Sequence, residues 1–261
     1  MIRAPISEHS KVISVISSVA VIVLLYSAMC LWQKHVNPRD TVIPNASQFV
    51  EGIERIVHED WLWDDLKATY SRHIMGMTIG IIISVVVGMA MGCFPLAERF
   101  FVLPVSFLAK IPPTAMIAVY FVLFGTEMKM FAAMIALGIF PTLTQAIYEA
   151  AWNDVSDNKI YKAYTLGASN SEVIFNVVFQ QILPRVIENV RLMIGPAMVF
   201  LIAAEWAMAD VGFGYRLRIQ SRLLNMNVVY IYLIILGGTG YMMDWTMAAF
   251  RKWCCPWFGE E

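Results

Sequence analysis

The stretch Tyr161–Pro184, YKAYTLGASNSEVIFNVVFQQILP, is a polar interruption in an otherwise apolar chain, and it decides the fold. It predicts two short helices that are separated at Gly167, because glycine suits the left-handed residue that follows a helix C-terminus. Ser169 and Glu172 have the spacing of a capping box at the start of the second helix. Pro184 is expected to end that helix. The stretch therefore predicts a helical elbow on the aqueous side, between two membrane spans, that is available to a soluble partner.

The composition around this stretch is that of an integral membrane protein. Of the 261 residues, 59% are hydrophobic and only 15% are charged, and the mean hydropathy is +0.62. Soluble domains have about 45–50% apolar and about 25% charged residues. The net charge of −1 gives no case for a nucleic-acid binder. Because helices satisfy their own backbone groups in lipid, the expected fold class is an all-α integral membrane protein.

Six apolar stretches approach or exceed the roughly 20 residues that a span requires. Arg3 and Lys11 precede the first stretch, which is too long for a signal-peptide core and has no small-residue cleavage site after it. Pro112–Pro113 is expected to break or kink the third. The six predicted spans are Val12–Trp32, Ile74–Phe94, Phe100–Phe124, Met128–Ile147, Leu192–Ala209 and Val228–Phe250.

Two further patterns concern packing. The second predicted span has small residues every fourth position, which favours close approach of another helix over a pore-lining role. The loop Val42–Tyr70 has an amphipathic helical pattern with two open interpretations, a helix on the membrane surface or a docking surface for an outside partner. The small residues of the second predicted span are Gly76, Gly80, Ser84, Gly88 and Gly92.

Several motifs together resemble the permease subunits of bacterial ABC importers, in particular the nitrate/sulfonate/taurine group. In that family the loop contains Glu-Ala-Ala, three residues and Gly, followed by an apolar helix that ends in a repeated Leu-Pro. The similar segments here cover roughly residues 70–225. They are Tyr161-Lys162-Ala163 with Gly167-Ala168-Ser169, Leu183-Pro184, Ile111-Pro112-Pro113 with Leu123-Phe124-Gly125, Arg191-Leu192 with Ala204-Glu205, and Val211-Gly212-Phe213-Gly214-Tyr215.

The resemblance implies six spans, an inside N-terminus, a homodimer and a location in the bacterial inner membrane. The raw Lys and Arg counts at the span ends are equal on the two sides, and Arg216–Arg222 argues against this orientation, which the resemblance nevertheless favours. The implied domains are 1–72, an N-terminal span with an outer amphipathic loop, and 73–261, the permease domain with a coupling loop at 152–185.

The resemblance also implies partners. ATP-binding subunits would hold the short helix of the elbow and hydrolyse ATP–Mg, and an extracytoplasmic binding protein would deliver a small anion such as nitrate or a sulfonate. This chain would be neither an enzyme nor a cofactor binder, and it has no G-x-x-x-x-G-K-[ST] loop. The implied ATPase-coupling residues are Tyr161, Lys162, Ala163, Leu166, Gly167 and Ala168. Candidate contacts for the outer partner are Arg216, Arg218 and Arg222.

The chain departs from the family pattern at the elbow. In this chain Tyr161 stands where the family has Glu, and Lys162 stands at one of the family's Ala positions. Gln180 stands where the family has the first Pro of the repeated Leu-Pro. These differences favour a dedicated partner ATPase. Glu149-Ala150-Ala151 spells the motif, but Val155 stands where the Gly belongs, so we assign this segment to the inner end of the fourth span.

Ionisable residues inside spans are functional candidates. Lys110, next to Pro112 and Pro113, has two open interpretations, an anion contact on the translocation path or a structural ion pair, with Glu205 as a possible partner. Glu205 is itself a path candidate. Asp244 near the inner end of the sixth span is expected to be structural.

Metal binding is the weaker interpretation of the remaining residues, and no metal site is expected. Met75, Met77, Met89 and Met91 suit gap-filling in a bundle, and the spacing of His58, Glu59, Asp60 and His73 matches no known ligand set. The four cysteines are expected to be reduced thiols, although Cys254–Cys255 could be lipidated or redox-active. The alternative functions are an ion-coupled transporter with a Lys110–Glu205–Asp244 relay, or a membrane metalloenzyme using those histidines and carboxylates.

Overall fold

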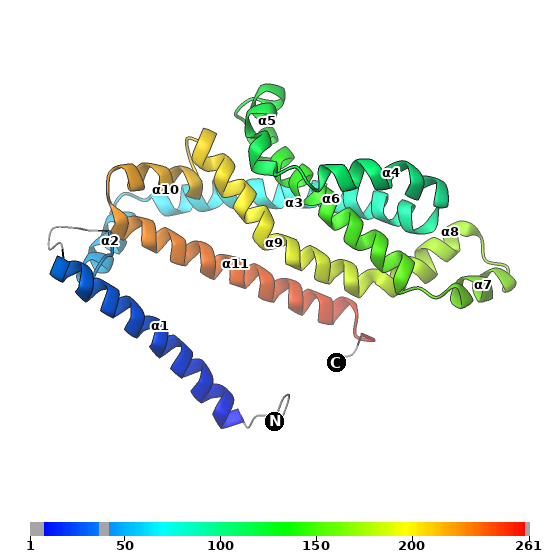
Figure 1. Cartoon of the computed structure of the whole chain (residues 1–261), viewed down its shortest axis with the longest axis horizontal. Helices are drawn as coiled ribbons and strands as arrows, with labels where there is room; N and C mark the ends of the chain where they lie inside the picture. Colours follow the sequence, from blue (N-terminus) through cyan, green and yellow to red (C-terminus); the bar gives the residue numbers. More distant parts are fainter. Residues whose placement is uncertain (1–7, 37–41, 259–261) are drawn as a thin grey trace. The chain divides into compact units, whose positions relative to one another are not determined.

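The computed structural model describes residues 8–36 and 42–258, and every element in these ranges is helical, which confirms the all-α class. Arg3, used above for orientation, lies outside the described residues. The chain forms two compact units, residues 1–59 with 219–232, and residues 60–218 with 233–261. The elements are α1 Glu8–Val36, α2 Ala46–His58, α3 Trp61–Cys93, α4 Pro95–Leu108, η1 Pro113–Met116, α5 Ile117–Phe124, α6 Met128–Asn153, α7 Asp157–Thr165, α8 Asn170–Glu172, η2 Val173–Phe179, α9 Gln180–Met208, α10 Phe213–Arg222 and α11 Met226–Cys254 (Figure 1).

The first unit joins α1 and α2 to the end of α10 and the first turns of α11. The rings of Tyr26, Phe49 and Tyr230 pack pairwise at 6.2–6.3 Å between centroids. Gly52 on α2 lies against Ile231 of α11, where a Cβ would come within 2.7 Å of Cδ1. The amphipathic pattern of 42–70 therefore covers two helices, because α2 ends at His58 and α3 begins at Trp61.

Within residues 8–36 and 42–258, five helices are long and apolar enough to cross a membrane, and the bent pair α4 and η1–α5 makes a sixth candidate. The predicted second span is part of the much longer α3, and the sixth extends to Met226–Cys254. The predicted break at Pro112–Pro113 is confirmed, since the two halves of the third span meet at 83°. Long helices thus extend most of the predicted spans beyond the apolar core.

The glycine stripe packs α3 directly on α6. A Cβ added at Gly76 would lie 2.6 Å from Ile135, one at Gly80 2.7 Å from Ile139, and one at Gly88 2.8 Å from Ile147. Ser84, in the same stripe, donates a hydrogen bond of 3.3 Å to the carbonyl of Phe140. The prediction of close helix packing is confirmed, and the partners on both helices advance in the same direction, so α3 and α6 are parallel.

The parallel direction bears on the broken third span. A chain that leaves one end of α3 must return to the other end before it can enter α6 in the same direction. The segment Pro95–Phe124 makes this return, so we count the bent pair as one candidate span. The described residues then hold six candidate spans, the number that the sequence predicts.

The prediction that Pro184 ends a helix is wrong. Residues Asn170–Met208 form one helical run through α8, η2 and α9, with Pro184 and Pro196 inside it. Residues Val173–Phe179 are π-helical, with bonds to the fifth residue back rather than the fourth. Proline is tolerated within membrane helices because packed neighbours and local π or 3₁₀ turns accommodate it. The fifth span therefore belongs to a 39-residue helix that starts at the elbow.

The glycine stripe makes the first testable prediction. Gly88→Val forces side-chain atoms into Ile147 and the Thr144 carbonyl, and overpacking of this kind costs about 1–3 kcal/mol. Gly195→Val is the matched control, because nothing lies within 4 Å of a Cβ at that helical position. Thermal unfolding of the purified protein in detergent should show a lower midpoint for Gly88→Val only. Equal midpoints for the two variants would contradict the packing assignment.

Candidate functional site

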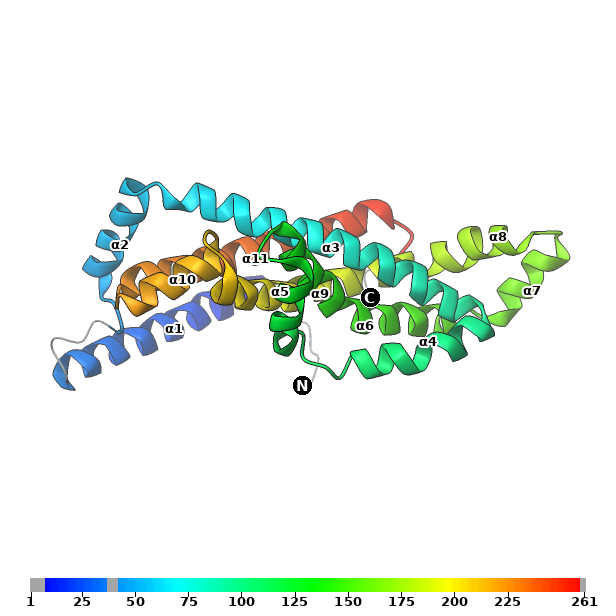
Figure 2. The ribbon, with the colours of Figure 1, turned by 90° about the horizontal axis from the view of Figure 1, so that it is seen from above.

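In the structure, the elbow predicted within the Tyr161–Pro184 region consists of α7, the turn at Gly167 and α8, residues 157–172. It lies beyond the end of α6 (Figure 2). Its first helix, α7, begins after Ser156 and carries no buried residue. Ile160 and Ala163 are half-buried and pack against the main core, which η2 extends through Val173 and Val178. The outer face of α7 is exposed, with Tyr161 at 65% of its surface and Leu166 at 88%.

The turn between the two elbow helices is a Schellman motif. Gly167 has a φ of +88°, its N–H donates to Tyr164 at 3.0 Å, and the Ala168 N–H donates to Ala163 at 3.1 Å. These are the two bonds that define the motif. The predicted C-terminal role of Gly167 is confirmed, and no atom lies within 4 Å of the place a Cβ would take.

The second elbow helix starts with the predicted capping box. The Ser169 N–H donates to the Glu172 carboxylate at 2.7 Å, and the Glu172 N–H donates to Ser169 Oγ at 3.4 Å. Tyr164 on α7 donates to Asn170 at 3.1 Å. Lys159 donates to Gln181 at 3.0 Å, and Gln181 in turn hydrogen-bonds the Asp154 carbonyl. The elbow is therefore fixed both within itself and to the helix behind it.

A cavity of about 690 Å³ lies where the elbow meets the ends of α3 and α6. Its lining includes Phe94 after α3, Trp152 from α6, and Tyr161 from α7. Both apolar and polar side chains of the elbow therefore remain accessible beside a concave surface.

The broken third span surrounds a second cavity of about 310 Å³. Lys110, Pro112 and Pro113 line it together with Tyr120 of α5 and Phe200 of α9. The Lys110 side chain is exposed, and its ammonium makes no hydrogen bond or ion pair with another described residue. The carbonyls of residues 108 and 109 lack the usual helical donors, because residues 112 and 113 are prolines. The Leu108 carbonyl accepts instead from the Ile111 N–H at 3.1 Å. A cation and the Ala109 carbonyl, which lacks its helical donor, thus share one cavity.

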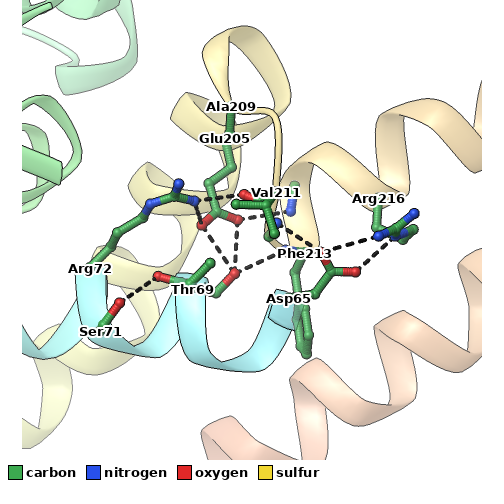
Figure 3. A network of polar contacts seen from close by, with 12 residues as sticks. Asp65, Thr69, Ser71, Arg72, Glu205, Ala209, Val211, Phe213 and Arg216 are labelled. Atoms are coloured by element: carbon green, nitrogen blue, oxygen red, sulfur yellow. Dashed lines mark hydrogen bonds and ion pairs between the residues drawn. The ribbon is translucent and has the colours of Figure 1, made fainter. Parts of the chain in front are cut away.

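Glu205 of α9 lies in a third site, a network of polar contacts with α3 and the start of α10 (Figure 3). Its fully buried carboxylate accepts hydrogen bonds from Arg72 at 2.7 Å, from Thr69 at 3.0 Å, and from the Gly214 N–H at 2.9 Å. The ion partner of Glu205 is therefore Arg72, and not Lys110, the partner that the sequence left open. Arg72 also donates to the Val211 carbonyl at 2.8 Å and stacks over Phe131 at 4.1 Å.

This network holds the start of α10. The N–H groups of Gly212, Phe213 and Gly214 donate to Asp65, Thr69 and Glu205, each at 2.9 Å. The first amides of a helix have no partner inside the helix and carry partial positive charge, so two buried carboxylates suit them. Gly212 has a φ of +120°, and a Cβ there would lie 2.7 Å from the Glu205 carboxylate. The Gly-Phe-Gly sequence thus allows the loop to approach Glu205.

Two of the predicted outer-contact arginines have structural partners. Arg216 donates to the buried carboxylate of Asp65 at 2.8 Å, and its guanidinium stacks on Trp61 at 4.2 Å. Arg218 donates to the carbonyls of residues 206, 207 and 209 at the C-terminal end of α9. Arg222, the last residue of α10, is exposed.

Asp244 is not part of a relay with Lys110 and Glu205. Both of its oxygens accept from Arg191 at 2.7 Å, which supports the predicted structural role. Sequence reasoning missed Arg72, Thr69 and Asp65, because the segment was assigned to an outer loop. Among the described residues, no group of three His, Cys, Asp or Glu side chains could hold a metal ion.

The helical bundle, its broken third span and its elbow define a membrane permease subunit. Residues 72–253 match the family described as "Binding-protein-dependent transport system inner membrane component", and the chain belongs to that family. It is therefore a multi-pass transport permease, as the motifs of the sequence indicate.

Individual proteins to which the chain is similar are also named as transport permeases. The chain is 25% identical over 199 residues to the taurine transport system permease protein TauC of Escherichia coli, covering 76% of this chain and 72% of the relative. It is 26% identical over 251 residues to a putative ABC transporter permease protein of Methanocaldococcus jannaschii, covering 91% and 92%. A putative aliphatic sulfonates transport permease protein, SsuC of Bacillus subtilis, is 23% identical over 207 residues, with 78% and 74% covered.

A solved structure shares the fold. A chain of the MetNI methionine ABC transporter, in an inward-facing conformation, superposes with a TM-score of 0.61 at 16% identity, covering 75% of this chain and 94% of that chain. At this identity the likeness concerns the fold alone.

The buried network makes the second prediction. Glu205→Gln leaves the Arg72 guanidinium without its counter-ion in a buried site, and breaking such a pair costs about 3–5 kcal/mol. Asp244→Asn is the control, because it removes the acidic partner of Arg191 from an ion pair whose Asp244 side chain is 38% exposed. An exposed ion pair contributes about 1 kcal/mol or less to stability. Thermal unfolding in detergent should separate the two variants clearly. Equal destabilisation would contradict the role assigned to Glu205.

Proposed function

We propose that two copies of this chain form the translocation path of an ATP-driven importer for a small anionic solute of the sulfonate or taurine type. The observation that carries this proposal is the elbow, a short exposed helix fixed by a Schellman turn and a capping box at the start of the Asn170–Met208 helix. Family membership supports a transport role, and the printed names of TauC and SsuC support the solute class.

The elbow suits a docking role because two of its outward side chains, Tyr161 and Leu166, are aromatic or apolar, while hydrogen bonds hold its backbone in place. Leu166 and Tyr161 are exposed in water on a segment where burial of an apolar side chain is worth about 1.5–3 kcal/mol. Tyr161 and Lys162 take the positions at which the chain departs from its family. We assign coupling to Tyr161, Lys162, Ala163, Leu166, Gly167 and Ala168, and expect a partner ATPase shaped for them.

The remaining parts of the importer would be other chains. ATP–Mg would be bound and hydrolysed by ABC ATP-binding subunits at the elbow, and a substrate-binding protein would dock on the opposite side, with exposed Arg222 as a candidate contact. The family description, with its inner membrane component and binding-protein dependence, supports both partners and a bacterial inner-membrane location. The orientation that fits this assembly places both the elbow and the N-terminus on the cytoplasmic side.

The solute path is assigned to the cavity of the broken third span. Lys110 supplies a cation with no partner among the described residues, and the proline break leaves the neighbouring Ala109 carbonyl without its helical donor. Discontinuous membrane helices commonly bind solutes in this way. An anion bound there would neutralise the Lys110 ammonium, because an unpaired charge within a span is costly.

The coupling assignment predicts a specific uncoupling. Leu166→Asp places a carboxylate at the most exposed apolar position of the elbow and should lower solute-stimulated ATPase activity of the reconstituted complex at least tenfold, because desolvating that charge opposes docking. Leu166→Met keeps the apolar volume and should retain activity. Co-purification of the ATPase subunit measures docking directly. Full coupling in Leu166→Asp would sink the assignment of the elbow.

The path assignment predicts a charge requirement at Lys110. Lys110→Gln should lower uptake of taurine or an alkanesulfonate into proteoliposomes about tenfold, which corresponds to about 1.4 kcal/mol, since a charge-assisted contact is lost. Lys110→Arg keeps the charge and should retain most of the uptake. Unchanged uptake in Lys110→Gln, with the complex still assembled, would remove Lys110 from the path.

A further inference from the structure

A cavity of about 210 Å³ lies in the second unit between α3, α9 and α11, and the proposed transport cycle makes no use of it. Four of its lining residues carry nitrogen or sulfur donors, and they come from two helices. The donors are His73 and Met77 of α3 with Met243 and Met247 of α11. The rest of the lining is Ile74, Thr78, Ile81, Val190, Ile194 and Thr246.

His73 lines this cavity, and its ring nitrogens lack hydrogen-bond partners. The side chain is fully buried, and neither Nδ1 nor Nε2 has a hydrogen-bond partner. An unpaired buried polar group costs about 1–3 kcal/mol, and such groups are rare in native proteins. The nearby hydroxyls are already used, because Thr78 and Thr246 donate to the carbonyls of residues 74 and 243, each at 2.8 Å. The imidazole therefore lacks a partner that a bound ligand would supply.

The donors are arranged by helical spacing. His73 and Met77 are four residues apart on α3, as are Met243 and Met247 on α11, so each pair lies on one face of its helix. Both pairs line the same cavity. Two helices thus contribute one histidine and three methionines to the lining of one cavity, a combination that no spacing along the sequence reveals.

We propose that this cavity is a binding site for a soft monovalent metal ion, Cu(I), with His73, Met77, Met243 and Met247 as ligands. Thioether and imidazole donors suit Cu(I), whereas hard cations require oxygen ligands. All four donors are neutral and no carboxylate lines the cavity, since Asp244 is held by Arg191. A divalent ion would bring two uncompensated charges into a span, and a monovalent ion brings only one. Rotation about χ2, a broad torsion for histidine, turns a ring nitrogen toward the ion.

A bound ion would tie α11 to α3. Thr239 of α11 already hydrogen-bonds Tyr70 of α3, and Asp244 of α11 pairs with Arg191 of α9. The ion would lie on the same side of α11 as these contacts, and would add a bond between two helices that are otherwise joined there by side-chain packing. The proposal is independent of the transported solute and of the partner ATPase.

The test uses Ag(I), a redox-inert probe for the same donors, on the full-length protein in detergent. All four cysteines are first replaced by alanine, because Cys30, Cys93, Cys254 and Cys255 are free thiols that would bind the same ion. We expect one Ag(I) per chain to survive desalting and X-ray absorption to show sulfur and nitrogen scatterers in a ratio of three to one. The triple variant Met77→Leu, Met243→Leu and Met247→Leu keeps the side-chain volume and should weaken Ag(I) binding at least about 100-fold, beyond the effect of losing an outer-shell partner.

The matched control is the double variant Met75→Leu and Met242→Leu, which removes two thioethers from the same helices. Both methionines are exposed, at 40% and 63%, and neither lines the cavity, so Ag(I) binding should be unchanged. Met243→Leu alone, the mildest change, should weaken binding at least about tenfold. Equal metal retention by the triple variant and the control, or a bound ion with no sulfur scatterer, would overturn the proposal.

Discussion

The parallel packing of α3 on α6 is the constraint on which the rest of the permease domain depends. Glycines every fourth residue bring the two backbones close enough that side chains of α6 fill the space a Cβ would take. In lipid, where apolar burial contributes little between helices, such close contact is a main source of association energy. Because the two helices share a direction, the intervening segment has to return along them, and its proline break lies within that return.

The same two helices place the functional regions at opposite ends. The elbow cavity includes Gly92 and Ala151, where the glycine stripe ends, while Asp65, Thr69 and Arg72 lie in the first turns of α3. At 1.5 Å per residue, the 33 residues of α3 span about 50 Å. The buried carboxylate network and the elbow therefore lie near opposite ends of α3.

Local sequence carries the features that local physics determines. The capping box, the Gly167 turn, the proline break and the glycine stripe were all predictable because each depends on residues within a few positions. Pro184 was misjudged because in a packed membrane helix its cost is absorbed by neighbours and by the π-helical segment before it. The partner of Glu205 could not be predicted, because Arg72 is far away in sequence and no local signal links them. The one available signal was Gly212 and Gly214, whose missing side chains indicate a group that approaches the backbone closely.

The elbow and Glu205 are also joined along the chain. The helical run that the capping box starts at Asn170 carries Glu205 close to its other end. Under the proposed function, a force on α7 enters this helix through Gln181 and the packed face of η2, and it reaches the α10 loop through the Glu205 carboxylate. The π-helical turn lies between the two, and such turns are frequent at functional sites because their looser bonding tolerates a change of register. The Glu205 carboxylate joins the end of α9 to Arg72 and Thr69 of α3 and to the start of α10, so under the proposed function a movement of one of these helices would be passed to the other two.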